Sequence, residues 1–226
     1  LVLDQARGVA VVAMVIYHMA WDLSHFGLVE TAVAIAPGWR LFAQTIAASF
    51  LAIAGVSLAL GAGRGLDRAV FLKRLIRIAG AALLVTLATR IAFPQSFIFF
   101  GILHCIAFSS MIAALFLRAP PWAATLAGLA FLSLPMLFRA EAFEMPALVW
   151  LGLGKTPPVS NDFVPVFPWT GFMLLGLAAG RLLGPWLRSA RVLRLPPLAW
   201  LGRWSLPIYL VHQPLLYGGL MLAIQA

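Results

Sequence analysis

Seven runs of mostly apolar residues, each about 17–23 residues long, constrain this chain more than any other feature. That is the length a helix needs to cross the hydrocarbon core of a bilayer. A soluble fold with 63% hydrophobic and 10% charged residues would leave large apolar patches in water. The sequence therefore predicts an all-α, polytopic membrane helix bundle of seven spans, forming one domain over residues 1–226. The spans are predicted at 6–23, 41–62, 74–93, 101–117, 122–138, 166–184 and 204–224.

The basic residues are distributed unevenly between the two sides of the predicted bundle. If the runs alternate across the membrane, twelve lysines and arginines lie on one side and four on the other. Basic loop residues stay in the cytoplasm. The sequence thus predicts a cytoplasmic N-terminus and an extracytoplasmic C-terminus. The twelve are Arg7, Arg64, Arg68, Lys73, Arg74, Arg77, Arg118, Arg181, Arg188, Arg191, Arg194 and Arg203, and the four are Arg40, Arg90, Arg139 and Lys155.

Composition and missing motifs exclude several classes of function. The net charge of +9 predicts no nucleic-acid partner, because the basic residues lie between apolar runs and form no single polar face. One cysteine, Cys105, excludes an internal disulfide and a cysteine-based metal cluster. The sequence contains no P-loop, dinucleotide fingerprint or zinc-protease motif, and we expect no metal.

The first apolar run carries ionisable residues on one helical face. At about 100° per residue they fall within roughly 60° of one another. Ionisable groups at membrane depth are costly and usually mark a functional site. A carboxylate four residues from a histidine can orient its imidazole as a general base, whereas the structural alternative is a pair that joins this span to its neighbours. The residues are Arg7, His18, Asp22 and His25, with Asp4 extending the stripe.

Other polar residues fall in the middle or outer half of the predicted membrane. His104 begins the fourth span, and His212 lies near the middle of the seventh. Tyr209 lies one turn before His212, and Pro214 is expected to kink that span. Asp162 directly precedes the sixth span. The structural alternatives are a hydrogen bond from His212 to a neighbouring helix, an interfacial His104, and an Asp162 that caps the sixth span.

Four segments together resemble one family. They are residues 3–10 with the histidine and aspartate that follow, 101–104, 162–171 and 201–214. The set resembles bacterial membrane proteins related to the catalytic domain of heparan-α-glucosaminide N-acetyltransferase, and its last segment also resembles membrane acyltransferases that modify cell-surface sugars. The chain is shorter than the lysosomal enzyme and has fewer spans. The resemblance implies two candidates for the catalytic histidine: His25 is nearest in position to that of the lysosomal enzyme, and His18 is closer to the histidine of the sugar O-acyltransferases.

The resemblance implies acyl transfer across a bacterial inner membrane. An acyl group, expected to be acetyl, would pass from cytoplasmic acyl-CoA to an extracytoplasmic sugar, lipid or amine. The residues expected to carry catalysis are His18, Asp22, His25, His104 and His212. Those expected to bind the acyl-CoA are Asp4, Arg7, Arg74 and Arg77, and those expected to bind the acceptor are Asp162, Trp169 and Tyr209.

Two functions from other classes remain open at this point. A small transporter or flippase would use the polar stripe as a substrate or proton path. It would move solute without consuming acyl-CoA. A structural or assembly protein would use its histidines only to bind neighbouring helices, and its histidine variants would lose stability rather than activity.

Overall fold

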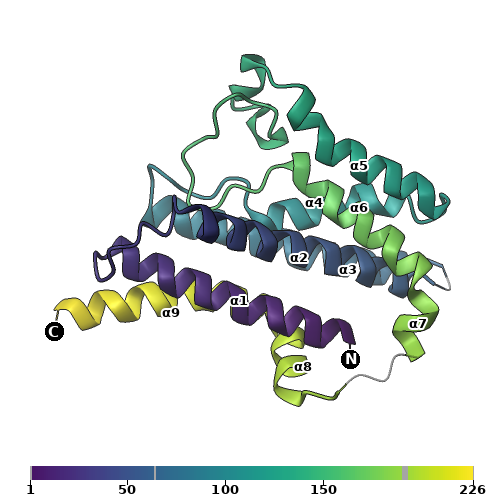
Figure 1. Ribbon diagram of the computed structural model, residues 1–226, viewed down its shortest axis with the longest axis horizontal. Coiled ribbons are helices and arrows are strands. Elements are labelled where there is room, and N and C mark those ends of the chain that lie inside the picture. The colour runs from purple at the N-terminus through teal and green to yellow at the C-terminus, as the bar shows by residue number, and fades with distance from the viewer. Residues whose placement is uncertain (1, 64, 190–192, 226) are drawn as a thin grey trace. The chain divides into compact units, whose positions relative to one another are not determined.

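The computed structural model describes residues 2–63, 65–189 and 193–225, and the regular elements in these ranges are helices (Figure 1). The all-α prediction is confirmed. Arg64 and Arg191 lie outside the described residues, as does the side chain of Arg188. The elements are α1 (Val2–His25), α2 (Pro37–Gly61), α3 (Arg68–Ala92), α4 (Ile102–Leu115), α5 (Pro121–Leu137), the 3₁₀ helices η1 (Glu141–Glu144) and η2 (Val149–Leu151), α6 (Val166–Leu182), α7 (Gly184–Ser189), α8 (Pro196–Arg203) and α9 (Ser205–Gln225).

Each predicted apolar run corresponds to one of these helices. The largest shift is at α3, which begins at Arg68 rather than at residue 74. Asp67 causes it, because its carboxylate accepts hydrogen bonds from the backbone amides of Ala69 and Val70 at 2.9 and 3.1 Å and so caps the first turn. The short helices α7 and α8 fall where the sequence predicted only a loop.

Four helices are long and apolar enough to cross a membrane, namely α1, α2, α3 and α9. The helices α4, α5 and α6 are apolar but shorter. The outer face of α3 is apolar, with Ile76, Leu83 and Ile91 largely exposed. These properties indicate an integral membrane protein.

The chain divides into two compact units, Leu1–Phe50 with Ala190–Ala226, and Leu51–Ser189. The boundary falls within α2, so the first part of this helix belongs to one unit and the rest to the other. We call them the terminal unit and the central unit.

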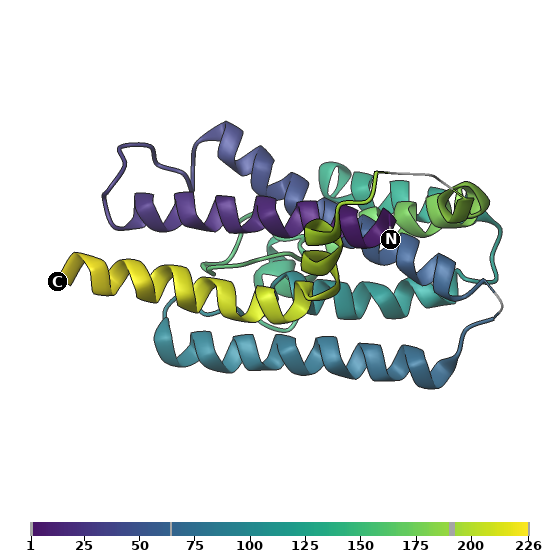
Figure 2. The ribbon, with the colours of Figure 1, turned by 90° about the horizontal axis from the view of Figure 1, so that it is seen from below.

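In the terminal unit, α1 packs against α8 and α9. Figures 1 and 2 both show α1 and α9 side by side and running in the same direction. Val11 and Met14 of α1 form a buried cluster with Ile46 of α2, and Ile208 of α9 packs against it. The helices α1 and α9, which lie far apart in the sequence, are thus joined along one face of α1.

The contact between α1 and α8 depends on two glycines. A Cβ atom at Gly8 would overlap the backbone carbonyl of Leu198, and one at Gly202 would overlap that of Asp4. Small residues let helix backbones approach this closely. The glycines therefore set how α8 lies against the N-terminal part of α1.

We expect the Gly202→Ala variant to destabilise the protein by about 1–3 kcal/mol, because the two backbones must separate. The matched control is Gly218→Ala in α9, where no heavy atom lies within 4 Å of the added Cβ. That substitution should leave stability unchanged or raise it by up to about 1 kcal/mol, since alanine favours helix. Thermal unfolding in detergent would compare the two, and equal stabilities would contradict the close contact.

In the central unit, α6 packs against α4 and α5. It also meets the second part of α2, where a Cβ at Gly176 would overlap the backbone of Ala52. Ser109 of α4 and Thr170 of α6 share a buried hydrogen bond of 2.7 Å between their hydroxyls. The helices α2 and α4, which make these two contacts, run parallel to α6, whereas α5 runs antiparallel to it.

The segment between α5 and α6 is closed by a clasp of two glutamates. Glu144 Oε1 accepts hydrogen bonds from the backbone amides of Thr156 at 3.0 Å and Lys155 at 3.1 Å. The Lys155 ammonium contacts the Glu141 carboxylate at 2.8 Å. The hydrogen bond from Thr156, followed by weaker contributions including those from Lys155, holds the pKa of Glu144 below its ordinary value of 4.5.

This clasp is expected to open in acid. Because the folded pKa of Glu144 is lowered, its contribution to stability is present above pH 4.5 and is lost as the pH falls through the lowered pKa. Amide hydrogen exchange at Lys155 and Thr156, corrected for the intrinsic pH dependence, would measure the opening. In Glu144→Gln, whose amide oxygen does not titrate, protection should not change over this range. A wild-type profile identical to that of the variant would refute the clasp.

Candidate active site

A histidine pair joins α1 to α9 in the terminal unit. His212 Nε2 lies 3.2 Å from His18 Nδ1, and the two rings meet edge to face with centroids 4.7 Å apart. His18 Nδ1 also lies 3.0 Å from the carbonyl oxygen of Met14. On the other ring, His212 Nδ1 lies 2.7 Å from the carbonyl oxygen of Tyr209. Each histidine is therefore oriented by the backbone of its own helix.

These contacts assign the protons of the neutral pair. A carbonyl oxygen can only accept, so His212 Nδ1 carries a hydrogen and donates it to Tyr209. His212 Nε2 is then an acceptor, and it receives the Nδ1–H of His18, which also points toward Met14. The proton-free nitrogen of His18 is consequently Nε2, which is the atom that a base or nucleophile requires.

A second pair between the same helices lies one turn further along α1. Gln213 Nε2 donates to Asp22 Oδ1 at 2.7 Å. Asp22 is fully buried, and its Oδ2 and the Oε1 of Gln213 have no hydrogen-bond partner among the described residues. Two buried acceptor oxygens thus lie beside the histidine pair and need donors.

The sequence predicted that His18 and Asp22 pair with each other, and the structure shows a different arrangement. The two residues share one face of α1, as their spacing predicts, but that face meets α9. His18 therefore turns to His212 and Asp22 turns to Gln213. The structural alternative for His212 was a hydrogen bond to a neighbouring helix, and the contact of His212 with His18 agrees with it. This contact is compatible with a chemical role for His18.

His25 lies apart from the histidine pair and is the exposed member of a partly buried aromatic cluster. Its ring stacks on Trp21 with centroids 5.0 Å apart and planes 10° apart. The Tyr217 hydroxyl of α9 lies 3.5 Å from His25 Nε2, and Phe26 contacts both rings. The contacts of α1 with α9 thus ascend along both helices, which confirms that the two are parallel.

The basic end of the stripe lies beside α8. Arg7 Nη1 is 3.5 Å from Asp4 Oδ1 and donates to the carbonyl of Gly202 at 3.4 Å. Gln5 donates to the carbonyl of Leu193 at 2.9 Å. Arg7 and Asp4 therefore form a half-buried ion pair that is held against the last turn of α8.

His104 and Asp162 meet at the start of α4 in the central unit. His104 Nδ1 accepts from the amide of Gly101 at 3.2 Å, and its Nε2 lies 3.1 Å from the Thr86 hydroxyl. Asp162 Oδ2 accepts from the amide of Ile102 at 2.9 Å. Asp162 thus caps α4 rather than α6, because the segment before α6 folds back beside residues 96–100. Both side chains complete the first turn of α4.

The remaining predicted site residues also lie in the central unit. Arg74 and Arg77 are on α3, where Arg77 is exposed and Arg74 is half-buried. Trp169 is half-buried on α6 and contacts Phe172 with ring centroids 5.8 Å apart. Among the described residues, no group of three or more histidine, cysteine, aspartate or glutamate side chains could hold a metal.

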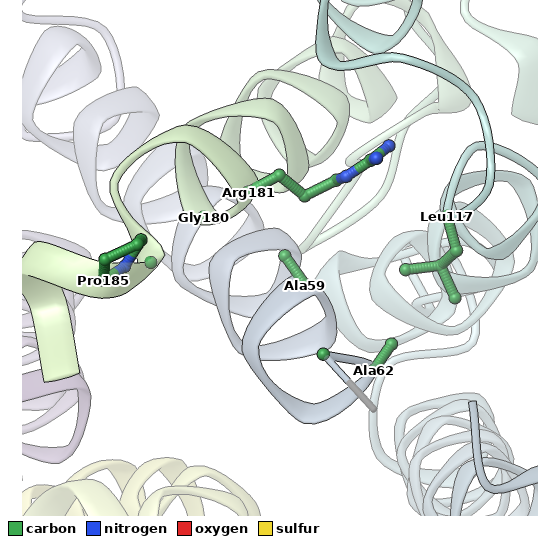
Figure 3. A pocket seen from close by; sticks show the side chains of 8 residues that line it. Ala59, Ala62, Leu117, Gly180, Arg181 and Pro185 are labelled. Atoms are coloured by element: carbon green, nitrogen blue, oxygen red, sulfur yellow. The ribbon is translucent and has the colours of Figure 1, made fainter. Parts of the chain in front are cut away.

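A cavity of about 450 Å³ opens at the C-terminal ends of α2, α4 and α6 in the central unit (Figure 3). Its one charged lining residue, Arg181, donates from Nη1 to the carbonyls of Ala119 and Phe116 and so satisfies the end of α4. The remaining lining is small or apolar: Ala59, Ala62, Gly63, Leu117, Gly180, Gly184 and Pro185. Nη1 of Arg181 is engaged by backbone oxygens, and among the described residues the cavity holds no second ionisable side chain in its lining.

Sequence reasoning did not assign a role to Gln213 or Tyr217. The signal for Gln213 was present, since it is a carboxamide within an apolar run and adjacent to His212. Its partner could not be deduced, because the rotation of α9 relative to α1 depends on their packing. Tyr209 contributes its carbonyl oxygen, in addition to a ring contact with His212 at 5.6 Å.

Comparison with known proteins finds one family. The family model described as heparan-alpha-glucosaminide N-acetyltransferase, catalytic, matches residues 1–214. The match covers nearly the whole chain and includes both units. No curated protein matches the chain, and no solved structure does.

Proposed function

Because the chain belongs to the heparan-α-glucosaminide N-acetyltransferase catalytic family, we propose that it transfers an acetyl group from acetyl-CoA to an acceptor across a bacterial inner membrane. The observation that carries this proposal is the histidine pair of α1 and α9, which leaves Nε2 of His18 as a base inside an apolar helix bundle. The family supports the acetyltransferase-like chemistry. The choice of residues and the direction of transfer are our inference.

In the proposed reaction, His18 Nε2 removes a proton from the acceptor nitrogen as that nitrogen attacks the thioester carbonyl. A C–N bond forms and the C–S bond breaks. The proton on His18 then passes to the leaving thiolate, so the products are the amide and CoA thiol. His212 accepts the Nδ1–H of His18 throughout and stabilises the imidazolium that forms.

The unpartnered oxygens of Asp22 and Gln213 favour an amine acceptor. A buried carboxylate is costly unless it is paired with a charge and hydrogen-bonded. A primary ammonium group carries a positive charge and three donors, enough for both oxygens, whereas a hydroxyl has one donor. We propose that Asp22 and Gln213 bind the amine as its ammonium ion, which releases one proton to solvent before the neutral amine attacks. Tyr217 and His25 would line its approach.

Basic residues would hold the donor. We propose that Arg7, oriented by Asp4, binds a phosphate of CoA as a charge-assisted pair. Arg74 and Arg77 of α3 are proposed for CoA binding separately, on the sequence prediction alone. Seven crossings with a cytoplasmic N-terminus would put these residues on the donor side. The parallel direction of α1 and α9 supports an odd number of crossings between the two helices, in keeping with the five that the prediction of seven spans puts there.

The other predicted site residues have supporting roles in this proposal. His104 and Asp162 shape the start of α4, since their polar atoms are engaged there. Trp169 of α6 is proposed for the acceptor on the sequence prediction alone. Tyr209 acts through its carbonyl oxygen, which orients His212.

The test is acetyl-CoA consumption by purified protein in proteoliposomes. We expect thiol release that depends on an added primary amine, with glucosamine as the first probe, and a matching acetylated product. Movement of the amine across the membrane without thiol release would instead support a transporter. If acetyl-CoA up to millimolar concentration neither raised thermal stability nor released thiol with any amine tested, the proposal would be wrong.

A further inference from the structure

The helix α8 has two distinct faces. Ala199 and Gly202 are buried, and Gly202 contacts the backbone of α1. Trp200, Arg203 and Trp204 lie on another face at helical spacing and are exposed. The first face explains how α8 is attached to the terminal unit, but the exposed face has no explanation within the fold.

The exposed face combines aromatic and basic side chains. Trp200 and Trp204 are each 52% exposed and lie near each other, with ring centroids 6.3 Å apart. Arg203 lies beside them, and Arg194 is exposed two residues before α8 begins. Among the described residues neither arginine makes an ion pair. Both are therefore available to an anionic partner.

The position of α8 places this face at the end of a membrane helix. Figures 1 and 2 show α8 turned across the direction of α1 and α9, near the N-terminus of α1. A short helix across the ends of spanning helices lies in the plane of the membrane surface. Tryptophan prefers the headgroup level of a bilayer, and arginine at that level attracts anionic lipid.

We propose that the exposed face of α8, with Arg194, Arg203, Trp200 and Trp204, binds the phosphate headgroups of anionic phospholipids. Charge complementarity favours a phosphate ligand. The neighbouring leucines Leu193 and Leu195 are exposed as well, which favours a lipid over a soluble phosphate compound, because lipid also supplies an apolar surface. This inference does not depend on the proposed acetyl transfer.

The experiment is native mass spectrometry of the purified protein with phosphatidylglycerol or phosphatidylcholine. We expect the wild type to retain phosphatidylglycerol preferentially. Each of Arg194→Gln and Arg203→Gln should lower the apparent affinity for it about fivefold. The charge-preserving double variant Arg194→Lys/Arg203→Lys should retain the preference. Arg40→Gln is the matched control, because Arg40 is an exposed arginine of the same unit at the start of α2.

Two results would overturn the inference. One is equal retention of phosphatidylglycerol by wild type and by the Arg194→Gln/Arg203→Gln double variant. The other is a loss of CoA binding in that double variant with unchanged lipid retention, which would assign the face to a soluble phosphate ligand. The first result does not bear on acetyl transfer, which is measured separately by thiol release, whereas the second would place part of the CoA site on α8.

Discussion

The His18→Ala variant is expected to lose amine-dependent acetyl transfer by a factor of about 10²–10⁴, the usual contribution of a positioned general base. Thiol release at saturating acetyl-CoA would measure the loss. Removing the ring also leaves Nε2 of His212 without its donor, at a cost of about 1–3 kcal/mol in stability. Thermal unfolding of the same preparation separates that cost from the loss of the base.

Two further measurements make the His18 assignment specific. Added imidazole should restore part of the activity of His18→Ala, which it would not do if the ring served only for packing. The rival residue is His25, whose ring is exposed and stacked on Trp21. We expect His25→Ala to lose less than tenfold, at most about 1.4 kcal/mol of transition-state stabilisation. A larger loss than in His18→Ala, without loss of fold, would transfer the catalytic role to His25.

The second large effect is expected at Asp22. Asp22→Asn keeps the shape of the side chain but removes its charge. Loss of one partner from a buried, hydrogen-bonded charge pair costs about 2–5 kcal/mol, so kcat/KM for the amine should fall roughly 30- to 5,000-fold. Hydrolysis of acetyl-CoA in the absence of an amine should change little. Steady-state kinetics with varied amine would show the effect.

A charge exchange across the pair provides the control. In the double variant Asp22→Asn/Gln213→Glu, the carboxylate moves to the facing helix while the carboxamide partner remains. We expect this variant to recover part of the activity lost in Asp22→Asn. If Asp22→Asn instead reduced transfer to amines and hydroxyl compounds equally, or only lowered the unfolding temperature, the amine-binding role would be excluded.

Most of the secondary structure could be predicted because its causes are local. The apolar runs that became α4, α5 and α6 have ends within two residues of the predictions, since helices in apolar surroundings continue until the run stops. The short helix α8 was not predicted. Only two of its residues are buried, which is too few to form a periodic apolar pattern. The contact that holds it in place, between Gly202 and α1, joins residues nearly two hundred positions apart.

The candidate site could be predicted only in part. Counting residues along two spans put His18 and His212 at a similar depth, and the 3.2 Å contact brings their rings together. The same counting paired Asp22 with His18, because neighbours on one helix are the only partners that spacing can indicate. The partner of Asp22 is Gln213, on a helix whose rotation no spacing reveals.

By itself, the sequence determined the helical composition, the approximate ends of the apolar helices and the polar face of α1. These depend on apolar length, periodicity and capping within a single segment. The tertiary structure alone decided that His18 faces His212, that Asp22 faces Gln213, and that Asp162 caps α4. Such pairings depend on the rotation and register of helices against one another, which are determined by close contacts such as those at Gly8 and Gly202.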